Sequence, residues 1–270
     1  MYSNKGNRSL NGREVQRVKT YVHLSRLWLL ALLYLGGAAA WAQAASVHRA
    51  FDEVLKAHVT DGQVDYPGIA ADPQFKEYLE TLKAFDVNTL ETREKQLAFW
   101  INAYNALVIQ GILEGRSPSS FFGRVEFFKT SEYEVGGRKI DLYDLEHEII
   151  RPLGEPRIHF AINCASRSCP KLRAEAYEST RLDQQLDDQA RMFINDPKRN
   201  QFDAERKTAR LSMIFDWFKE DFEKHSGSVP RYIAGYLGDQ AVATEFANGS
   251  YQIEHLQYDW DLNGLPPPRG

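Results

Sequence analysis

Two cysteines lie five residues apart in the segment HFAINCASRSCP, residues 159–170, and they are the only cysteines of the 270-residue chain. A thiolate is a nucleophile, and it needs a base nearby and positive charge to lower the thiol pKa. Cys164 follows an apolar run and precedes a small-residue loop, where unpaired backbone N–H groups can stabilise negative charge. Cys164 is therefore predicted to be a nucleophile, with Cys169 as the alternative nucleophile. Three arginines near it in sequence would favour the thiolate: Arg151, Arg157 and Arg167.

Histidine is the usual base for such a thiol, and His147 and His159 are the nearest in sequence. The run IHFAINC is short and apolar, which predicts a buried strand ending at Cys164. Side chains alternate along a strand, so His159 would face away from Cys164. His147, on the predicted helix LYDLEHEIIR, is then the expected base. The backbone N–H groups of residues 165–167 are the expected oxyanion donors.

A third catalytic partner would have to come from elsewhere in the fold, because Glu146 is adjacent to His147 and diverges from it on a helix. Asn102, on a long apolar helix, and Asp259, in the segment YDWDLN, are the candidates. A hydrogen-bonded structural role is the alternative for each of them.

Two other readings of the cysteines stay open. In an oxidising compartment Cys164 and Cys169 can form a small structural disulfide, since five residues allow the chain to turn back. A metal site could be assembled from both cysteines with His147 and His159, but the close ligand pairs of zinc sites are missing. No nucleotide-binding, serine hydrolase or zinc hydrolase motif occurs, and we predict neither a cofactor nor a bound metal.

The elements that must position these residues are mainly helical. The pattern of residues 94–114 predicts a long helix buried on nearly all sides, and EYEVGGRKI predicts a hairpin around Gly136 and Gly137. Asp141 is the expected N-cap of LYDLEHEIIR, and KTARLSMI is an expected strand. Helices and short strands mix without a regular βαβ rhythm. We therefore predict an α+β fold, a single domain with several helices packed around a small sheet of short strands.

The segment IFDWFKEDFEKH is predicted to form one helix. Its two aspartates, Asp216 and Asp221, are expected on the solvated side. The large aromatic residues of this segment and of YDWDLN are expected in the core: Trp217, Phe218, Phe222 and Trp260.

The N-terminus predicts export. Basic residues precede LWLLALLYLGGAAAWA, a run of about 16 uncharged residues that is shorter than a membrane span and ends in small residues. Residues 1–44 are predicted to be a signal peptide cleaved near Ala42 or Ala44, with a periplasmic location; an uncleaved N-terminal membrane anchor is the alternative. Loss of six basic residues and one acidic residue changes the formal charge from −4 to −9, which argues against a nucleic-acid partner. After removal of the signal, transient or no membrane association is expected.

Together the motifs FWINAYNALVIQGIL, LEHEIIR, HFAINCASRSCPKL, IFDWFKEDF and YDWDLN resemble, in this order, the bacterial and plant family catalogued as domain of unknown function 547. The resemblance covers nearly the whole mature chain, residues 45–264, and leaves residues 265–270 as a frayed tail. It implies no activity. The positions that fit the family pattern are Asn102, Glu146, His147, Arg151, His159, Asn163, Cys164, Ser168, Cys169 and Pro170.

The residues therefore predict an exported thiol-dependent hydrolase or acyltransferase that acts on peptide or amide substrates. Its partner would be a peptide, peptidoglycan or another envelope component. The alternative is a non-catalytic envelope protein, a binding or scaffold protein in which Cys164 and Cys169 form a disulfide.

Overall fold

The computed structural model describes residues 47–267, and the predicted signal segment, residues 1–44, lies outside them. The central element is helix α5 (Arg93–Leu113), which has fifteen buried residues, most of them apolar, and is covered on nearly all sides. Thr92 caps its start by accepting a hydrogen bond from the N–H of Lys95 at 3.2 Å. The predicted long helix is confirmed. Within residues 47–267 no helix is long and apolar enough to cross a membrane.

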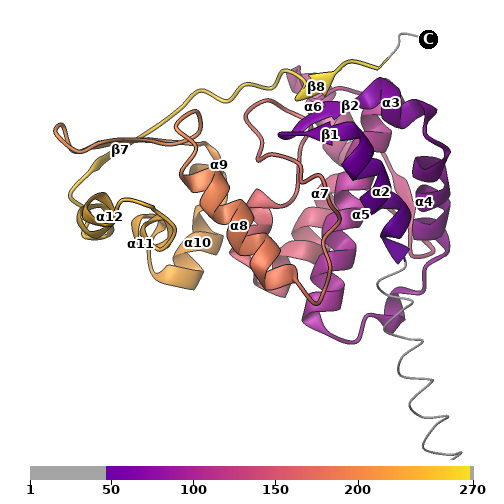
Figure 1. Ribbon diagram of the computed structural model, residues 1–270, viewed down its shortest axis with the longest axis horizontal. Helices are drawn as coiled ribbons and strands as arrows, with labels where there is room; N and C mark the ends of the chain where they lie inside the picture. The colour runs from indigo at the N-terminus through magenta and orange to yellow at the C-terminus, as the bar shows by residue number, and fades with distance from the viewer. Residues whose placement is uncertain (1–46, 268–270) are drawn as a thin grey trace, which may run out of the picture. The chain divides into compact units, whose positions relative to one another are not determined.

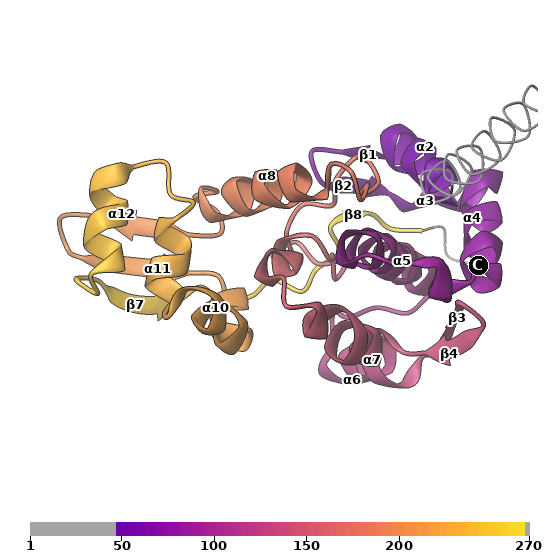
Figure 2. The same ribbon diagram turned by 90° about the horizontal axis from the view of Figure 1, so that it is seen from below.

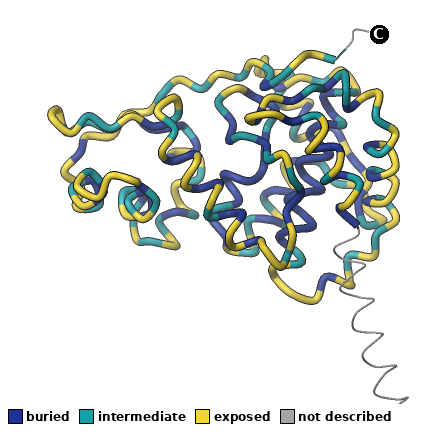
Figure 3. The backbone as a smooth tube through the Cα atoms, in the orientation of Figure 1, coloured by how far each residue is buried: buried dark blue, intermediate teal, exposed yellow. Residues whose placement is uncertain are grey.

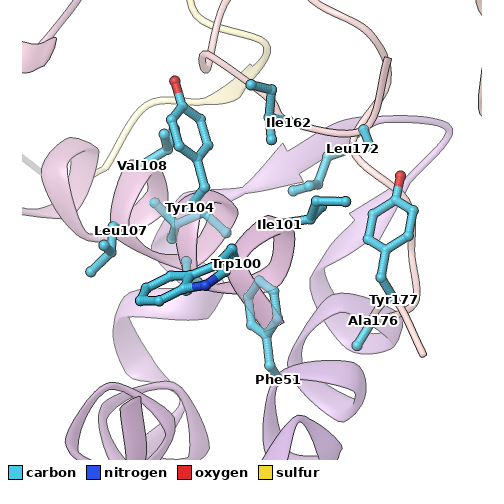
Figure 4. Packing of buried hydrophobic residues seen from close by; sticks show 14 of the residues in the cluster. Phe51, Trp100, Ile101, Tyr104, Leu107, Val108, Ile162, Leu172, Ala176 and Tyr177 are labelled. Atoms are coloured by element: carbon cyan, nitrogen blue, oxygen red, sulfur yellow. The ribbon is translucent and has the colours of Figure 1, made fainter. Parts of the chain in front are cut away.

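Helix α5 lies at the centre of the larger of two hydrophobic clusters (Figure 2). On one side it contacts α3 (Tyr66–Ala71) and α4 (Pro73–Ala84), with α2 (Arg49–His58) packed on α4. On the other side it contacts α7 (Leu142–Asp144) and the π-helix η3 (Leu145–Ile150). Figure 4 shows the side chains of this cluster, including Trp100 and Tyr104 from α5 and Ile162 from the loop that carries Cys164.

The strands are short and form three small sheets. Strands β1 (Val59–Thr60) and β2 (Gln63–Asp65) are antiparallel, and β8 (Gly264–Leu265) joins β2 in parallel. Strands β3 (Tyr133–Val135) and β4 (Arg138–Ile140) form the predicted hairpin, in which Gly136 and Gly137 have positive φ. The third sheet has the order β5 (Gln201–Asp203), β6 (Thr208–Leu211) and β7 (Gln252–His255). The predicted tail begins at Leu265, which pairs with Asp65; residues 268–270 are outside the described range.

The second hydrophobic cluster is built by the later helices, coloured orange to yellow in Figure 1. It contains α8 (Leu182–Ile194), α9 (Ile214–Trp217), α10 (Lys219–Ser226), α11 (Val229–Ala234) and α12 (Gln240–Ala247). The remaining elements are η1 (Val87–Thr89), α6 (Phe121–Val125), η2 (Glu126–Thr130), η4 (Arg151–Leu153) and η5 (Pro156–Phe160). Buried backbone runs through both clusters (Figure 3). The predicted fold class, a single α+β domain of helices and short strands, is confirmed.

Two predictions about local structure are wrong. The run IHFAINC is not a strand: its first part lies in the 3₁₀-helix η5, which begins at Pro156 and is capped by the side chain of Glu155. Its hydrophobic residues are buried on all sides, and such a run cannot be told from a strand by its pattern. The segment IFDWFKEDFEKH is not one helix either, because Phe218 leaves helical geometry, with φ −113° and ψ 25°, and separates α9 from α10.

Candidate functional site

Cys164 opens onto a pocket of about 150 Å³ that we call the thiol pocket. Its polar and sulfur-bearing lining residues are Glu146, His159, Cys164 and Cys169, together with the hydroxyl-bearing Tyr104 and Tyr258. The remaining walls are apolar: Phe128, Ile162, Pro170, Ile214, Trp217, Phe218 and Trp260. These residues come from α5, η2, η3, η5, the loop after η5, α9 and the C-terminal segment, so the pocket is built by the whole tertiary fold.

The π-helix η3 supplies the acid of the pocket. Asp141 caps the preceding turn, as predicted, by accepting a hydrogen bond from the N–H of Asp144 at 2.7 Å. The wider π turn is typical of functional sites. On it Glu146 is buried and lines the thiol pocket, whereas His147 is half-buried outside the lining.

The 3₁₀-helix η5 supplies the histidine. Because IHFAINC is not a strand, the alternation that was expected to separate His159 from Cys164 does not exist. Both residues line the same pocket. The His159 side chain is fully buried and stacks on Phe218, with ring centroids 3.8 Å apart. His159, and not the predicted His147, is therefore the histidine at the thiol pocket.

A network of buried amides holds the loop that carries Cys164. Asn105 on α5 donates to the carbonyl of Ala161 at 3.0 Å and accepts from the N–H of Asn163 at 2.8 Å. The side chain of Asn163 in turn donates to the carbonyl of Pro170 at 2.7 Å and accepts from the N–H of Ala165 at 2.8 Å. Ala165 has a φ of 60°, a strained backbone conformation for a residue with a Cβ. The loop is thus fixed in one shape directly after Cys164.

The sulfur of Cys164 is surrounded by hydrogen-bond donors. Its distance is 3.0 Å to Ser166 Oγ and 3.1 Å to the Tyr258 hydroxyl. Burial raises the pKa of Cys164, but hydrogen bonds from Cys169, Ser166 and Tyr258 outweigh it and lower the pKa from 9.0 to about 7. Cys169 is also a free thiol, and its Sγ accepts from the N–H of Cys164 at 2.8 Å. Burial and the charge of its neighbour raise the pKa of Cys169, so Cys164 is the thiol that ionises.

Glu146 is a buried carboxyl group without a hydrogen-bond partner at Oε1. Burial raises its pKa from 4.5 to about 8, and the neighbouring negative charges of Cys164 and Asp221 act in the same direction against the opposing Arg151. Burial therefore favours the protonated carboxyl of Glu146, whereas hydrogen bonds favour the thiolate of Cys164. Two groups with pKa values displaced in opposite directions are typical of an acid and a nucleophile at one site.

His159 connects Glu146 to a partly buried ion pair. Its Nε2 lies 2.7 Å from Asp221 Oδ2, and Arg151 holds the same carboxylate with two hydrogen bonds of 2.8 and 3.0 Å. Burial raises the pKa of Asp221, but the bonds from His159 and Arg151 outweigh it and hold the pKa well below its usual range. An ionised carboxylate only accepts hydrogen bonds, so Nε2 carries the hydrogen.

The other ring nitrogen of His159 faces Glu146. Burial lowers the pKa of His159, although Asp221 opposes this, so the ring is neutral and its Nδ1 is an acceptor. Nδ1 has no hydrogen-bond partner and lies 3.9 Å from Glu146 Oε1. A small movement would let protonated Glu146 donate to it. Asp221 was predicted on the solvated side of a helix, and that prediction is wrong because the break at Phe218 starts a new helix.

The other predicted site residues have different surroundings. His147 Nδ1 lies 3.0 Å from the carbonyl oxygen of Tyr143, and the two rings stack. Asn102 makes two hydrogen bonds to the backbone of Tyr177, of 2.8 and 2.9 Å. These bonds correspond to the structural role that was the alternative to a catalytic role for Asn102. Asp259 is exposed and accepts from the backbone of Ser168.

The predicted oxyanion donors are largely engaged. The N–H of Ala165 donates to Asn163, and the N–H of Arg167 donates to the carbonyl of Asp261 at 2.7 Å. The turn around Ser168 does not continue into a helix. The backbone N–H of Ser166, another predicted donor, is directed at the Cys164 sulfur, and the hydroxyls of Ser166 and Tyr258 also contact the sulfur and lie 3.2 Å from each other.

Most of the aromatic residues expected in the core form a wall of this pocket. Phe222 is fully buried, as predicted, but Trp217 is 44% exposed. Trp217, Tyr258 and Trp260 form a cluster with ring centroids 4.6 to 5.8 Å apart. The sequence signal that could have found this wall is the repeated aromatic–acidic pattern of IFDWFKEDF and YDWDLN. The predicted strand excluded His159 as the base, because alternation would turn its side chain away from Cys164. Glu146 was excluded as a catalytic partner because a residue adjacent to His147 on a helix diverges from it.

Residues 87–194 match the model of a family described as Protein of unknown function, DUF547. This range contains Asn102, Glu146, His159, Cys164 and Cys169, whereas Asp221 and the aromatic wall residues follow it. No curated protein and no solved structure matches the chain. Among residues 47–267 there is no group of three or more His, Cys, Asp or Glu side chains that could hold a metal ion.

Proposed function

Because the chain belongs to the family described as Protein of unknown function, DUF547, a description without an activity, we propose its function from the thiol pocket itself. We propose a thiol-dependent hydrolase or acyltransferase in which Cys164 is the nucleophile. One observation carries this proposal: the sulfur of Cys164 shares a pocket with the unpaired carboxyl of Glu146 and the buried His159, which Asp221 orients.

In the first step the Cys164 thiolate attacks a carbonyl carbon and forms a tetrahedral intermediate. The hydroxyls of Ser166 and Tyr258, now bonded to the sulfur, are close enough to stabilise the charge as it moves to the carbonyl oxygen. Glu146, protonated at neutral pH, donates its proton to the leaving amine or alcohol. A thioester on Cys164 remains.

In the second step the ionised Glu146 takes a proton from water or from an acceptor nucleophile, which then attacks the thioester carbon. The C–S bond breaks, Cys164 leaves as the thiolate, and the acyl group is released as the acid or on the acceptor. Neutral His159 accepts a hydrogen bond at Nδ1 and holds the Glu146 carboxyl in place when it is protonated. Asp221 fixes the tautomer and orientation of His159, as the third member does in other nucleophile–base arrangements. The substrates proposed are peptides, peptidoglycan or other amides of the cell envelope, consistent with the N-terminal sequence and the acidic mature chain.

The alternative is a non-catalytic envelope protein with a Cys164–Cys169 disulfide. The closeness of the two thiols favours it, since the Cys164 N–H reaches the Cys169 sulfur at 2.8 Å. Mass spectrometry of protein purified from the exported fraction, alkylated with and without prior reduction, separates the two. A fully closed disulfide as the resting state would exclude the thiolate mechanism.

The direct test is the rate of alkylation of Cys164 by iodoacetamide between pH 5 and 10, followed by peptide mass spectrometry. We expect the rate to rise with a midpoint of about 7, and Cys169 to remain unmodified. The variant C169A keeps Cys164 but loses the hydrogen bond from Cys169, so its alkylation midpoint should lie above that of the wild type. Incubation with an activated ester should then place the acyl group on Cys164, and C164S should abolish turnover. An ester hydrolysed equally well by C164S would refute the proposal.

A further inference from the structure

The thiol pocket has a composition that selects its occupant. Apart from the reactive groups, its walls are formed by aromatic and aliphatic side chains, and no lysine or arginine belongs to the lining in the described part of the chain. Among the titratable lining residues, the raised pKa of Glu146 keeps this carboxyl neutral, and burial keeps His159 neutral as well. The lining group that ionises most readily is the thiol of Cys164, whose charge is negative, so an anionic substituent would find no opposite charge on the walls.

The arginines near the pocket already have partners. Arg151 is committed to Asp221 through two hydrogen bonds. Arg124 lies over the Trp260 ring, with its guanidinium carbon 4.7 Å from the ring centroid, and donates to the carbonyl of Pro118 at 3.3 Å. Trp260 lines the pocket but Arg124 does not. An anionic group could therefore bind at Arg124 only outside the pocket lining. A variant of Arg124 would lose such binding and so distinguish it from binding in the pocket.

The size of the pocket limits the occupant further. A cavity of about 150 Å³ lined by apolar side chains accommodates a benzene-sized molecule in an engineered protein. The thiol pocket has a volume of about 150 Å³. Trp217 and Trp260, whose rings lie 5.8 Å apart at an angle of 27°, supply flat apolar surface to its lining. One ring or one branched aliphatic side chain fits, but a polysaccharide unit with its many hydroxyls would lose hydrogen bonds to water.

We propose, on the basis of the proposed function, that the acyl group delivered to Cys164 is uncharged, apolar and about the size of one benzene ring. In a peptide substrate this group would be a residue such as phenylalanine or leucine, and acidic residues would be rejected. The aromatic wall formed by Trp217, Tyr258 and Trp260 is the part of the site that determines this specificity.

Acylation by two activated esters tests the proposal. The uncharged probe is 4-nitrophenyl phenylacetate, and the anionic probe is 4-nitrophenyl hemisuccinate; the release of nitrophenol and the mass of the Cys164 peptide are followed. We expect the wild-type protein to react at least tenfold faster with phenylacetate, after correction for the rate of each ester with a free thiol. Equal corrected rates, or faster reaction with hemisuccinate, would overturn the proposal.

Variants locate the specificity in the wall. W217R introduces a cation at a residue that is 44% exposed, so the fold should tolerate it, and it should shift the preference toward hemisuccinate by at least tenfold. F122A is the matched control, since Phe122 is 82% exposed and outside the pocket lining, and its preference should equal that of the wild type. An unchanged preference in W217R would overturn the assignment of the wall. Loss of the hemisuccinate reaction in R124A would also overturn the assignment of the wall, because this result would show that Arg124 selects the substrate.

Binding without chemistry separates this inference from the proposed function. In C164S, the uncharged amide phenylacetamide should quench the fluorescence of the pocket tryptophans, and the anion succinamate should not. If phenylacetamide binds while no ester acylates the wild type, the pocket specificity holds and the proposed catalysis fails. If Cys164 is acylated but phenylacetamide does not bind and both esters react equally, catalysis holds and the specificity fails.

Discussion

Replacement of Glu146 by glutamine should make the stability of the protein less dependent on pH. In the wild type, burial raises the pKa of Glu146 from 4.5 to about 8. Between these values the folded protein keeps a proton that the unfolded chain has lost. Stability from this group is therefore fully present below pH 4.5 and falls as the pH rises to about 8. The difference between the two pKa values corresponds to about 5 kcal/mol as an upper limit.

Glutamine has the same shape but does not titrate, so the variant should gain stability relative to the wild type as the pH rises. Urea unfolding of E146Q and wild type, followed by tryptophan fluorescence at pH 5, 6, 7, 8 and 9, measures this gain. We expect the free energy of unfolding of E146Q, minus that of the wild type, to increase by a few kcal/mol across this range. The reasoning would be refuted by a difference that stays constant within about 0.5 kcal/mol, the usual size of a surface substitution effect.

Two controls isolate the carboxyl group. Glu148 is exposed on the same π-helix, and E148Q should show a constant difference from the wild type. Cys164 ionises in the same range with a lowered pKa, and therefore contributes stability of the opposite sign, gained as the pH rises from about 7 to 9. The comparison is consequently repeated in the C164S background, where the Glu146 effect should persist in a reduced form because the thiolate contributes to its raised pKa.

Three further substitutions probe the framework of the site. D221N removes the carboxylate that accepts from His159, and should cost about 1 to 3 kcal/mol in urea unfolding and at least 100-fold in acylation rate; unchanged acylation would contradict an orienting role. N163A removes the side chain that holds the thiol loop, and should cost about 2 to 4 kcal/mol and raise the midpoint pH of Cys164 alkylation; an unchanged midpoint would show that the loop is held otherwise. N102A should lower the free energy of unfolding by about 1 to 3 kcal/mol but leave the midpoint of Cys164 alkylation unchanged, and a shifted midpoint would return Asn102 to the catalytic candidates.

The elements with strong local signals could be predicted from the sequence. Helix α5 has a wide apolar face and a threonine cap, and the hairpin β3–β4 has two glycines at positions that require positive φ. Asp141 is the N-cap for the same local reason. In each case the residues that determine the structure are neighbours in the chain. The fold class followed from such elements because their order and lengths excluded a regular βαβ pattern.

The candidate site depended on contacts that a local pattern does not contain. Cys164 was identified because thiol chemistry is restricted to two residues of the chain. The histidine and the acid of the site were not identified. The choice of His147 over His159 depended on a predicted strand, and the structure has a 3₁₀-helix there. Glu146 was considered only as a partner of its sequence neighbour. Its role follows from burial, which raises its pKa, and burial is a property of the packed fold.

The break at Phe218 shows how one tertiary contact changes the site. A continuous helix through IFDWFKEDF satisfies the local pattern, and it directs Asp221 to solvent. In the structure the Phe218 ring lies on the buried imidazole of His159, with centroids 3.8 Å apart, and the backbone leaves helical geometry at this residue. Helix α10 then starts anew, and its first turn brings Asp221 to His159 Nε2 and to Arg151. Because α9 ends before Phe218, Trp217 turns toward Trp260 and lines the thiol pocket. The same break therefore positions both the carboxylate that orients the histidine and the ring that limits the substrate, which is why substitution of Phe218 should affect acylation and specificity together.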